Sequence, residues 1–272
     1  MVVQKTPQEI ELMARAGAIL AAVHEVLRDA VRPGMTTADL DAVATAEIAA
    51  RGGEPGFLGT YDYPAATCIS VNDEIVHGIP SATRRLRAGD VVSVDCGVRW
   101  AGYHSDAACT WVVGGRDHAD ERTLTLIDAA YEALRRGIVA LRPGNRLGDV
   151  SYAIGAVAEQ HGLGVVAEHD GHTIGGHGIG RELHEDPQVL GRGRPGRGMR
   201  LRPGLVFAIE PMFVLGAPAW RTDPDGWTMR SRDGSLAAHW EHTVAITPAG
   251  PRVLTARPGE RGSLGEPALA AR

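Results

Sequence analysis

The chain has 272 residues, of which 44% are hydrophobic, and its 33 Asp and Glu residues against 28 Lys and Arg give a formal net charge of −5. This composition excludes a largely disordered chain, and the mild acidity excludes a general attraction to nucleic acid or to an anionic membrane. We therefore expect neither DNA nor a membrane as a partner. The three cysteines form no C-x-x-C pair and no apolar run nears 18 residues, so we expect a soluble cytoplasmic protein.

Two helices are predicted near the start of the chain. Thr6–Glu9 is a capping box with proline at the first helical position, and the apolar residues after it recur at helical spacing as far as the turn at 32–34. A second helix is predicted to begin after Thr36 or Thr37 and to end at the pair Gly52-Gly53.

The same order of elements recurs in the second half of the chain. A helix from about Glu121 to Leu141 and another that ends at Gly162 repeat the first pair. Two further matches follow in the same order: His77-Gly78-Ile79 with His177-Gly178-Ile179, and Leu86–Asp95 with Leu201–Glu210. We interpret the matches as an internal duplication, with a site between two related α/β halves.

A pair of aspartates lies in a predicted hairpin. Val91–Asp95 and Ala107–Val113 are strand-favouring runs, joined by a turn around 99–102. With a symmetric four-residue turn, Asp95 and Asp106 face each other directly, with Cβ atoms about 4.5–5.5 Å apart. Like charges at that distance require a cation between them. The alternative is a one-residue bulge that places the two aspartates on opposite faces of the hairpin, both in solvent.

Two further acids stand at the ends of strand-like runs. Glu210 ends an apolar run before a proline, and Glu241 begins a strongly strand-favouring run. Each alone is compatible with a solvated strand end, but Asp95 and Glu210 hold equivalent positions in the repeat. His177 lies in a glycine-rich segment that permits close backbone packing, and His184 reaches the same site only if the chain bends between them.

Four carboxylates and one or two histidines form an oxygen-rich ligand set, which favours Mn²⁺, Fe²⁺ or Co²⁺ over a cysteine-type zinc site. Four acids are too many for one ion but suit two ions about 3.5–4 Å apart, which lower the pKa of a bound water toward about 7. We therefore predict two divalent metal ions per chain and a hydrolytic reaction. The ligand types do not decide among these metals.

The motifs together resemble type I methionine aminopeptidase over about residues 5 to 255. The resemblance rests on the following segments: Cys68–Glu74, His77–Pro80, Val94-Asp95, His104–Asp106, Gly176–Gly180, His184–Pro187, Ile209–Met212 and Trp240–Thr243. It implies an α/β (α+β) pita-bread fold, in which two αββ halves related by a pseudo-twofold axis hold the metal site between them. It also implies metal-dependent removal of the initiator methionine from nascent proteins and peptides, with a preference for a small second residue.

The resemblance also implies a role for each site residue. Asp95 chelates one metal ion, Asp106 and Glu241 bridge the two, and His177 and Glu210 complete the other. The catalytic residues are His77 and His184, which hydrogen-bond the scissile peptide and the developing gem-diolate, and Glu210 as a proton shuttle. The substrate-binding residues are Tyr63, Cys68, His77, His184 and Trp227, with Phe57 and Leu183 as further candidates for the methionine pocket.

Domain and partner expectations follow. Residues 1–255 are expected to form a single catalytic domain with internal halves at about 5–115 and 119–250, followed by a disordered tail at 256–272. Nascent polypeptide N-termini are the expected partners, the ribosome is a further candidate, and a monomer is expected. The Arg- and Gly-rich segment 191–202 is interpreted as a solvated loop, with an RNA-contacting patch as the alternative.

Three other functions remain open. A prolidase or Xaa-Pro aminopeptidase shares the fold and all five ligands, but such enzymes usually carry a large N-terminal domain, and His77 comes too early to follow one. A non-catalytic peptide-binding relative is expected to have lost ligands, whereas all five are present. A structural α/β protein with solvated acids does not explain the paired positions of Asp95 and Glu210.

Overall fold

The computed structural model describes residues 2–260 and 264. The four predicted helices are present: α1 (Pro7–Ala30), α2 (Thr37–Ala50), α3 (Glu121–Ala140) and α4 (Leu147–His161), with single 3₁₀ turns at Thr60–Asp62 and Arg116–His118. The capping box of α1 is confirmed, because the Thr6 side chain accepts from the Glu9 backbone and the Glu9 side chain accepts from the Thr6 backbone. Helix α4 ends at Gly162 in the left-handed conformation, as the sequence predicts.

The strands form several antiparallel sheets. Their bounds are β1 (Glu54–Pro55), β2 (Thr67–Val71), β3 (Glu74–Val76), β4 (Val91–Trp100), β5 (Tyr103–Val112), β6 (Gly164–Val165), β7 (Glu168–His169), β8 (His172–Thr173), β9 (Gly176–Gly178), β10 (Glu185–Val189), β11 (Val206–Ile209), β12 (Met212–Val214), β13 (Trp220–Thr222), β14 (Met229–Ser231), β15 (Ala237–His239), β16 (His242–Thr247) and β17 (Gly250–Val253). One sheet joins β1 and β2 to β4, which also pairs with β5, and a second has the order β10-β9-β11-β16-β17.

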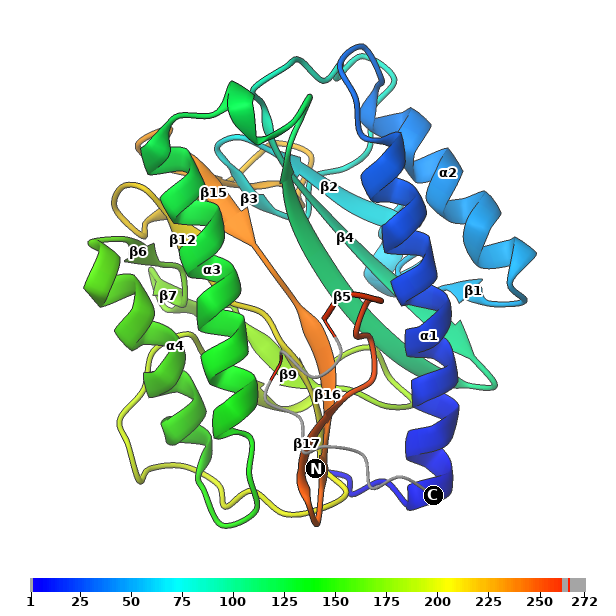
Figure 1. Cartoon of the computed structure of the whole chain (residues 1–272), viewed down its shortest axis with the longest axis vertical. Helices are drawn as coiled ribbons and strands as arrows, with labels where there is room; N and C mark the ends of the chain where they lie inside the picture. The colour runs from blue at the N-terminus through cyan, green and yellow to red at the C-terminus, as the bar shows by residue number, and fades with distance from the viewer. Residues whose placement is uncertain (1, 261–263, 265–272) are drawn as a thin grey trace.

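The two halves have the same architecture. In the first half, α1 and α2 precede the strand order β2-β4-β5, and in the second half α3 and α4 precede the order β9-β11-β16. The two helix pairs flank the strands on opposite sides of the molecule (Figure 1). Each half has its own hydrophobic core beneath its helices, one that includes Leu20, Leu40 and Val94, and one that includes Leu134, Ile154 and Phe207.

The halves meet where β5 lies beside the start of β16, in the middle of the view in Figure 1. The Glu241 N–H donates to the Ala108 carbonyl at 3.0 Å, and the Asp106 N–H donates to Thr243 Oγ1 at 2.8 Å. Because these bonds cross from one sheet to the other, they fix two of the predicted ligands against each other.

The expectation of a disordered tail from residue 256 is wrong for the described part of that segment. Ala256 is buried, Leu264 is fully buried against the second core, and the Arg257 guanidinium contacts both the Cys109 thiol and the Glu260 carboxylate. This anchoring ties the segment to β5, and the rest of the tail lies outside the described residues. The Arg- and Gly-rich loop is exposed over 192–198, as expected for a solvated loop.

Candidate active site

The hairpin formed by β4 and β5 corrects one prediction. The two strands are joined by a two-residue turn, Ala101-Gly102, with both residues at positive φ, rather than by the four-residue turn. The pairing therefore shifts by two residues, so that Asp95 lies opposite Ala108 and Asp106 lies opposite Gly97. The two aspartates are diagonal neighbours rather than directly opposite. Because the shift is even, they stay on the same face, and the bulged alternative is wrong.

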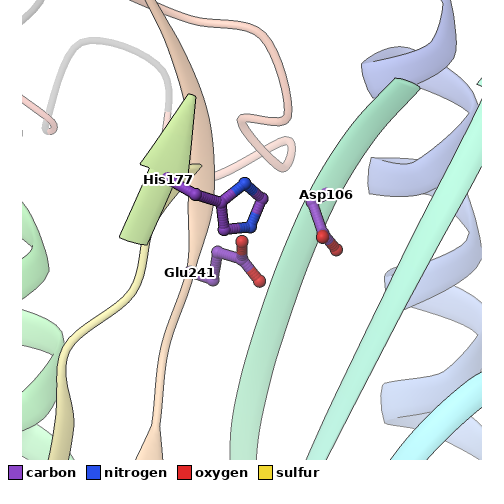
Figure 2. Close-up of side chains that lie close together, drawn as sticks. All are labelled: Asp106, His177 and Glu241. Atoms are coloured by element: carbon purple, nitrogen blue, oxygen red, sulfur yellow. The ribbon is translucent and has the colours of Figure 1, made fainter. Parts of the chain in front are cut away.

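Five strands bring the predicted ligands to one cavity. Asp95 and Asp106 come from the hairpin, His177 lies in β9, and Glu210 and Glu241 flank the facing ends of β11 and β16, where Ile209 pairs with His242. Ligand atoms of Asp106, His177 and Glu241 all lie within 4.8 Å of one another, and Figure 2 shows the three side chains converging from three strands.

The two histidines of the glycine-rich segment also converge. The chain turns back between β9 and β10, so the rings of His177 and His184 lie 4.3 Å apart. This is the bend that the prediction required. His177 Nδ1 lies 2.9 Å from the Gly178 carbonyl, and Nε2 lies 3.5 Å from Glu210 Oε1. An Nδ1–H donated to that carbonyl leaves the Nε2 lone pair directed at the carboxylates, the arrangement in which histidine binds a metal.

The buried acids raise one another's pKa. Burial raises the pKa of Asp95 to about 7, and burial together with neighbouring carboxylates raises the pKa values of Asp106 and Glu241 well above their usual range. Burial opposes ionisation of Glu210, but its contact with His239 and the nearby His177 lower its pKa below the ordinary value.

The chemistry of this cluster fits divalent cations. One oxygen each of Asp95, Asp106 and Glu241 is buried without a hydrogen-bond partner among the described residues. Unpaired buried carboxylate oxygens are costly unless a cation neutralises them. Hard oxygen ligands with one imidazole are the donor set of Mn²⁺, Fe²⁺ or Co²⁺.

A cavity of about 850 Å³ opens onto the cluster. All five predicted ligands line it, and so do the other predicted site residues: His77, His184, Tyr63, Cys68, Trp227, Phe57 and Leu183. Beside the metal cluster, Tyr63 and Trp227 pack edge to face with ring centroids 5.0 Å apart. The Tyr63 hydroxyl lies 3.0 Å from the Thr67 carbonyl and 3.2 Å from that of Gly78, which holds the ring in place.

Both non-ligand histidines are electrically neutral in this cavity. Loss of surrounding water lowers the pKa of half-buried His77 to about 4, and the same effect together with the nearby His177 lowers the pKa of His184, which stays exposed on one side, to about 4. His77 also has a left-handed backbone, with φ of 60°. A non-glycine residue in this conformation is strained, and such strain is common at functional sites.

Three residues near the cluster were not predicted. Tyr61 stacks on His184 with ring centroids 5.6 Å apart and covers the outer side of that histidine. Thr243 hydrogen-bonds both the N–H and the carbonyl of Asp106. His239 is buried and its Nε2 lies 3.4 Å from Glu210 Oε2. A sequence signal existed only for His239 and Thr243, which lie two residues on either side of Glu241.

Comparison with known proteins identifies the family of this site. The model of metallopeptidase family M24 matches residues 11–248. The chain belongs to this family. A methionine aminopeptidase of Mycobacterium tuberculosis is 46% identical to this metallopeptidase, and the match covers 94% of the metallopeptidase and 95% of the relative. A methionine aminopeptidase of Bacillus subtilis is 42% identical, and that match covers 94% of the metallopeptidase and 99% of the relative. These relatives confirm the resemblance to methionine aminopeptidases and favour that function over the prolidase alternative.

Solved structures agree with the pita-bread fold. A methionine aminopeptidase from Thermotoga maritima has a TM-score of 0.90 and 41% identity, and covers 94% of the metallopeptidase and 100% of that chain. A prolidase from Pyrococcus furiosus, with a TM-score of 0.73 and 24% identity, shares the fold, and the match covers 93% of the metallopeptidase but 65% of the prolidase chain. Among the described residues, no helix is both long and apolar enough to span a membrane.

Proposed function

We propose that this metallopeptidase removes the N-terminal methionine from nascent proteins and peptides when the second residue is small. One observation carries the proposal: the cavity that holds the five-ligand cluster also holds two neutral histidines and an apolar pocket. The relatives named as methionine aminopeptidases, at 42–46% identity over almost the full chain, support the same reaction. We place this activity in the cytoplasm, on a monomeric enzyme that acts on chains emerging from the ribosome.

Two divalent ions form the proposed metal centre. Asp95 and Glu210 would enter it from opposite halves of the molecule, Asp106 and Glu241 would bridge the two ions, and His177, whose ligand atom lies within 4.8 Å of theirs, would supply the imidazole ligand. When bound, Mn²⁺, Fe²⁺ or Co²⁺ ions polarise the peptide carbonyl and supply a nucleophilic water at neutral pH. Glu210 is the only one of the four carboxylates whose pKa lies below the ordinary value. It is therefore ionised at neutral pH, which is the form of a carboxylate that can take up a proton and pass it on.

His77 and His184 orient the peptide bond. With pKa values of about 4, both are uncharged at neutral pH, so each offers one ring N–H donor and one acceptor. A neutral donor can hydrogen-bond the carbonyl oxygen and stabilise the negative charge that develops on it during attack. The charge of a protonated imidazole would instead repel the metal ions.

The pocket beside the ligands is suited to a thioether side chain. Tyr63, Trp227 and Cys68 line it, and Phe57 and Leu183 add apolar surface. A methionine sulfur packs favourably against aromatic rings at about 5 Å, and its flexible chain fills an irregular pocket. The wall of the cavity thus selects the first residue of the substrate.

The test is cleavage of Met-Ala, Met-Leu and Ala-Pro peptides by metal-reconstituted enzyme, with Asp106→Asn as the inactivating variant and exposed Asp128→Asn as its matched control. We expect methionine release from Met-Ala, little from Met-Leu and none from Ala-Pro, with loss of activity only in Asp106→Asn. Cleavage of Ala-Pro in place of Met-Ala, or activity that persists in the presence of a chelator, would refute the proposal.

A further inference from the structure

His239 lies directly behind Glu210. It ends β15, is 1% exposed, and does not line the cavity. Its Nε2 is 3.4 Å from Glu210 Oε2, while the other carboxylate oxygen, Oε1, is 3.5 Å from His177 Nε2. Glu210 is therefore held between two imidazoles, one facing the metal cluster and one in the protein interior.

The backbone of His239 is fixed on both sides. Its N–H donates to Thr110 Oγ1 at 3.0 Å, and its carbonyl accepts from the same hydroxyl at 2.6 Å. The Thr110 proton is used in that bond, so Ser93 Oγ, 2.8 Å away, donates to Thr110. On the other side His239 pairs with Met212 of β12. These contacts fix the backbone position from which the His239 ring reaches Glu210.

The pseudo-twofold axis gives this arrangement a counterpart in the other half. Thr110 pairs with Ser93 on β4, and Thr243 pairs with Ala208 on β11, which are corresponding positions of the repeated segments. Thr243 Oγ1 bonds the N–H and the carbonyl of Asp106, each at 2.8 Å, as Thr110 Oγ1 bonds those of His239. His239 therefore occupies in the second half the position that the ligand Asp106 occupies in the first.

We propose that His239 is a positioning residue for the metal centre, and this inference rests on the proposed function. Its Nε2–H donates to Glu210 Oε2 and holds the carboxylate so that Oε1 faces His177 and the metal ions. A carboxylate ligand that can rotate freely about its side-chain bonds is not held toward the metal. Removal of a residue that hydrogen-bonds a metal ligand from outside typically weakens metal binding by about 10–100-fold. Nε2 is buried and makes no hydrogen bond among the described residues, and Glu210 Oε2, 3.4 Å away, is the carboxylate oxygen within its reach once the side chains tighten around the metal ions.

The inference is tested by titrating metal-free protein with Mn²⁺ in a calorimeter. His239→Leu keeps the volume without the donor, His239→Asn is too short to reach Glu210, and His239→Gln retains an N–H donor. The matched control is Val157→Ala, a fully buried core change in α4. We expect Leu and Asn to weaken Mn²⁺ binding by about 10–100-fold, and Gln to stay within about threefold of the wild-type protein. The control is expected to bind as the wild type does, even with a lower melting temperature.

The outcomes separate the two proposals. Wild-type affinity in the Leu and Asn variants overturns the role of His239, whereas failure of the wild-type protein itself to bind Mn²⁺ overturns the proposed metal centre. X-ray absorption of Co²⁺-loaded protein provides the second readout. An unchanged number of imidazole ligands in His239→Gln supports a positioning role. A loss of one imidazole makes His239 a direct ligand and refutes positioning.

Discussion

The glycine after His177 provides a sharp test of how β9 positions this proposed ligand. A Cβ on Gly178 would lie 2.3 Å from the carbonyl oxygen of Asp186 and 2.9 Å from its carbonyl carbon. Ordinary contacts begin near 3.4 Å, so β9 must move by about 1 Å relative to β10. Neither atom belongs to a flexible side chain, and on its other side Gly178 pairs with Phe207 of β11. The strand therefore has no free direction in which to shift.

The expected effect of Gly178→Ala is larger on the site than on the fold. Overpacking of this kind costs about 1–3 kcal/mol, which lowers the melting temperature by roughly 2–12 °C at about 2–4 °C per kcal/mol. A displacement of about 1 Å at the adjacent His177 costs about 100-fold in catalysis. We therefore expect kcat/KM for a Met-Ala peptide to fall by about 100-fold, with weaker Mn²⁺ binding.

The measurement compares calorimetric metal affinity, thermal unfolding and peptide cleavage in Gly178→Ala and Gly259→Ala. A Cβ on Gly259 meets no atom within 4 Å, so this variant controls for the glycine-to-alanine change itself. Gly259→Ala is expected to match the wild-type protein. Wild-type metal affinity and cleavage in Gly178→Ala would refute the reasoning that close packing of β9 fixes His177.

Three further predictions concern pH and specificity. In the metal-free protein, burial raises the pKa of Asp95 from 3.8 to about 7. The protonated side chain therefore adds to the free energy of unfolding in full below pH 3.8, and this stabilisation is lost as the pH rises through 7. We expect the free energy of unfolding to fall by roughly 4 kcal/mol over that range. Urea titration in the presence of a chelator measures this fall, and added Mn²⁺ is expected to restore the stability. A free energy of unfolding that does not change with pH would contradict the prediction. Burial alone would raise the pKa of Glu260, but its contacts with His242 and Arg257 lower that pKa from 4.5 to about 2. The stabilisation that the ionised Glu260 gives to the folded state is therefore present above pH 4.5 and is lost as the pH falls through 2. Glu260→Gln leaves buried Arg257 without its anion and is expected to cost about 3 kcal/mol at pH 7, and an unchanged urea midpoint argues against this. Trp227→Ala enlarges the methionine pocket and is expected to lower kcat/KM for Met-Ala by about 10–100-fold, mainly through KM; equal kinetics would remove Trp227 from the pocket.

Helix boundaries could be predicted because their signals are local. The Thr6–Glu9 capping box and the glycine turns act over a few residues, and the structure confirms them. The predicted length of the turn between β4 and β5 was wrong because Ala101 adopts a φ of 51°. An alanine side chain disfavours this conformation, and a sequence pattern does not indicate it. The prediction that Asp95 and Asp106 lie on the same face of the hairpin was nevertheless correct. Side chains alternate between the two faces of a strand, so a shift of the pairing by an even number of residues leaves each side chain on its face.

Contacts that depend on packing between distant segments were outside the reach of the sequence. The segment after residue 255 is rich in glycine, proline and alanine and therefore indicates a flexible tail. Its described residues up to Glu260 are held in place through Arg257, whose guanidinium meets Cys109 of β5 across the core. His239 was missed for the same reason, because its contact with Glu210 requires β15 to lie beside β12.

The register of the sheets also changes the meaning of the histidine repeat. Ser93 of β4 and Ala208 of β11 are corresponding residues; Ser93 pairs with Ser70 of β2, whereas Ala208 pairs with His177 of β9. The structural counterpart of His177 is therefore Ser70, and the echo of His77-Gly78-Ile79 in His177-Gly178-Ile179 is not an equivalence in space. The duplicated scaffold supplies equivalent strand positions, but the side chains at them have diverged. That divergence lets His177 face the carboxylates as a proposed ligand while His77, just after β3, faces the same cavity without joining the cluster.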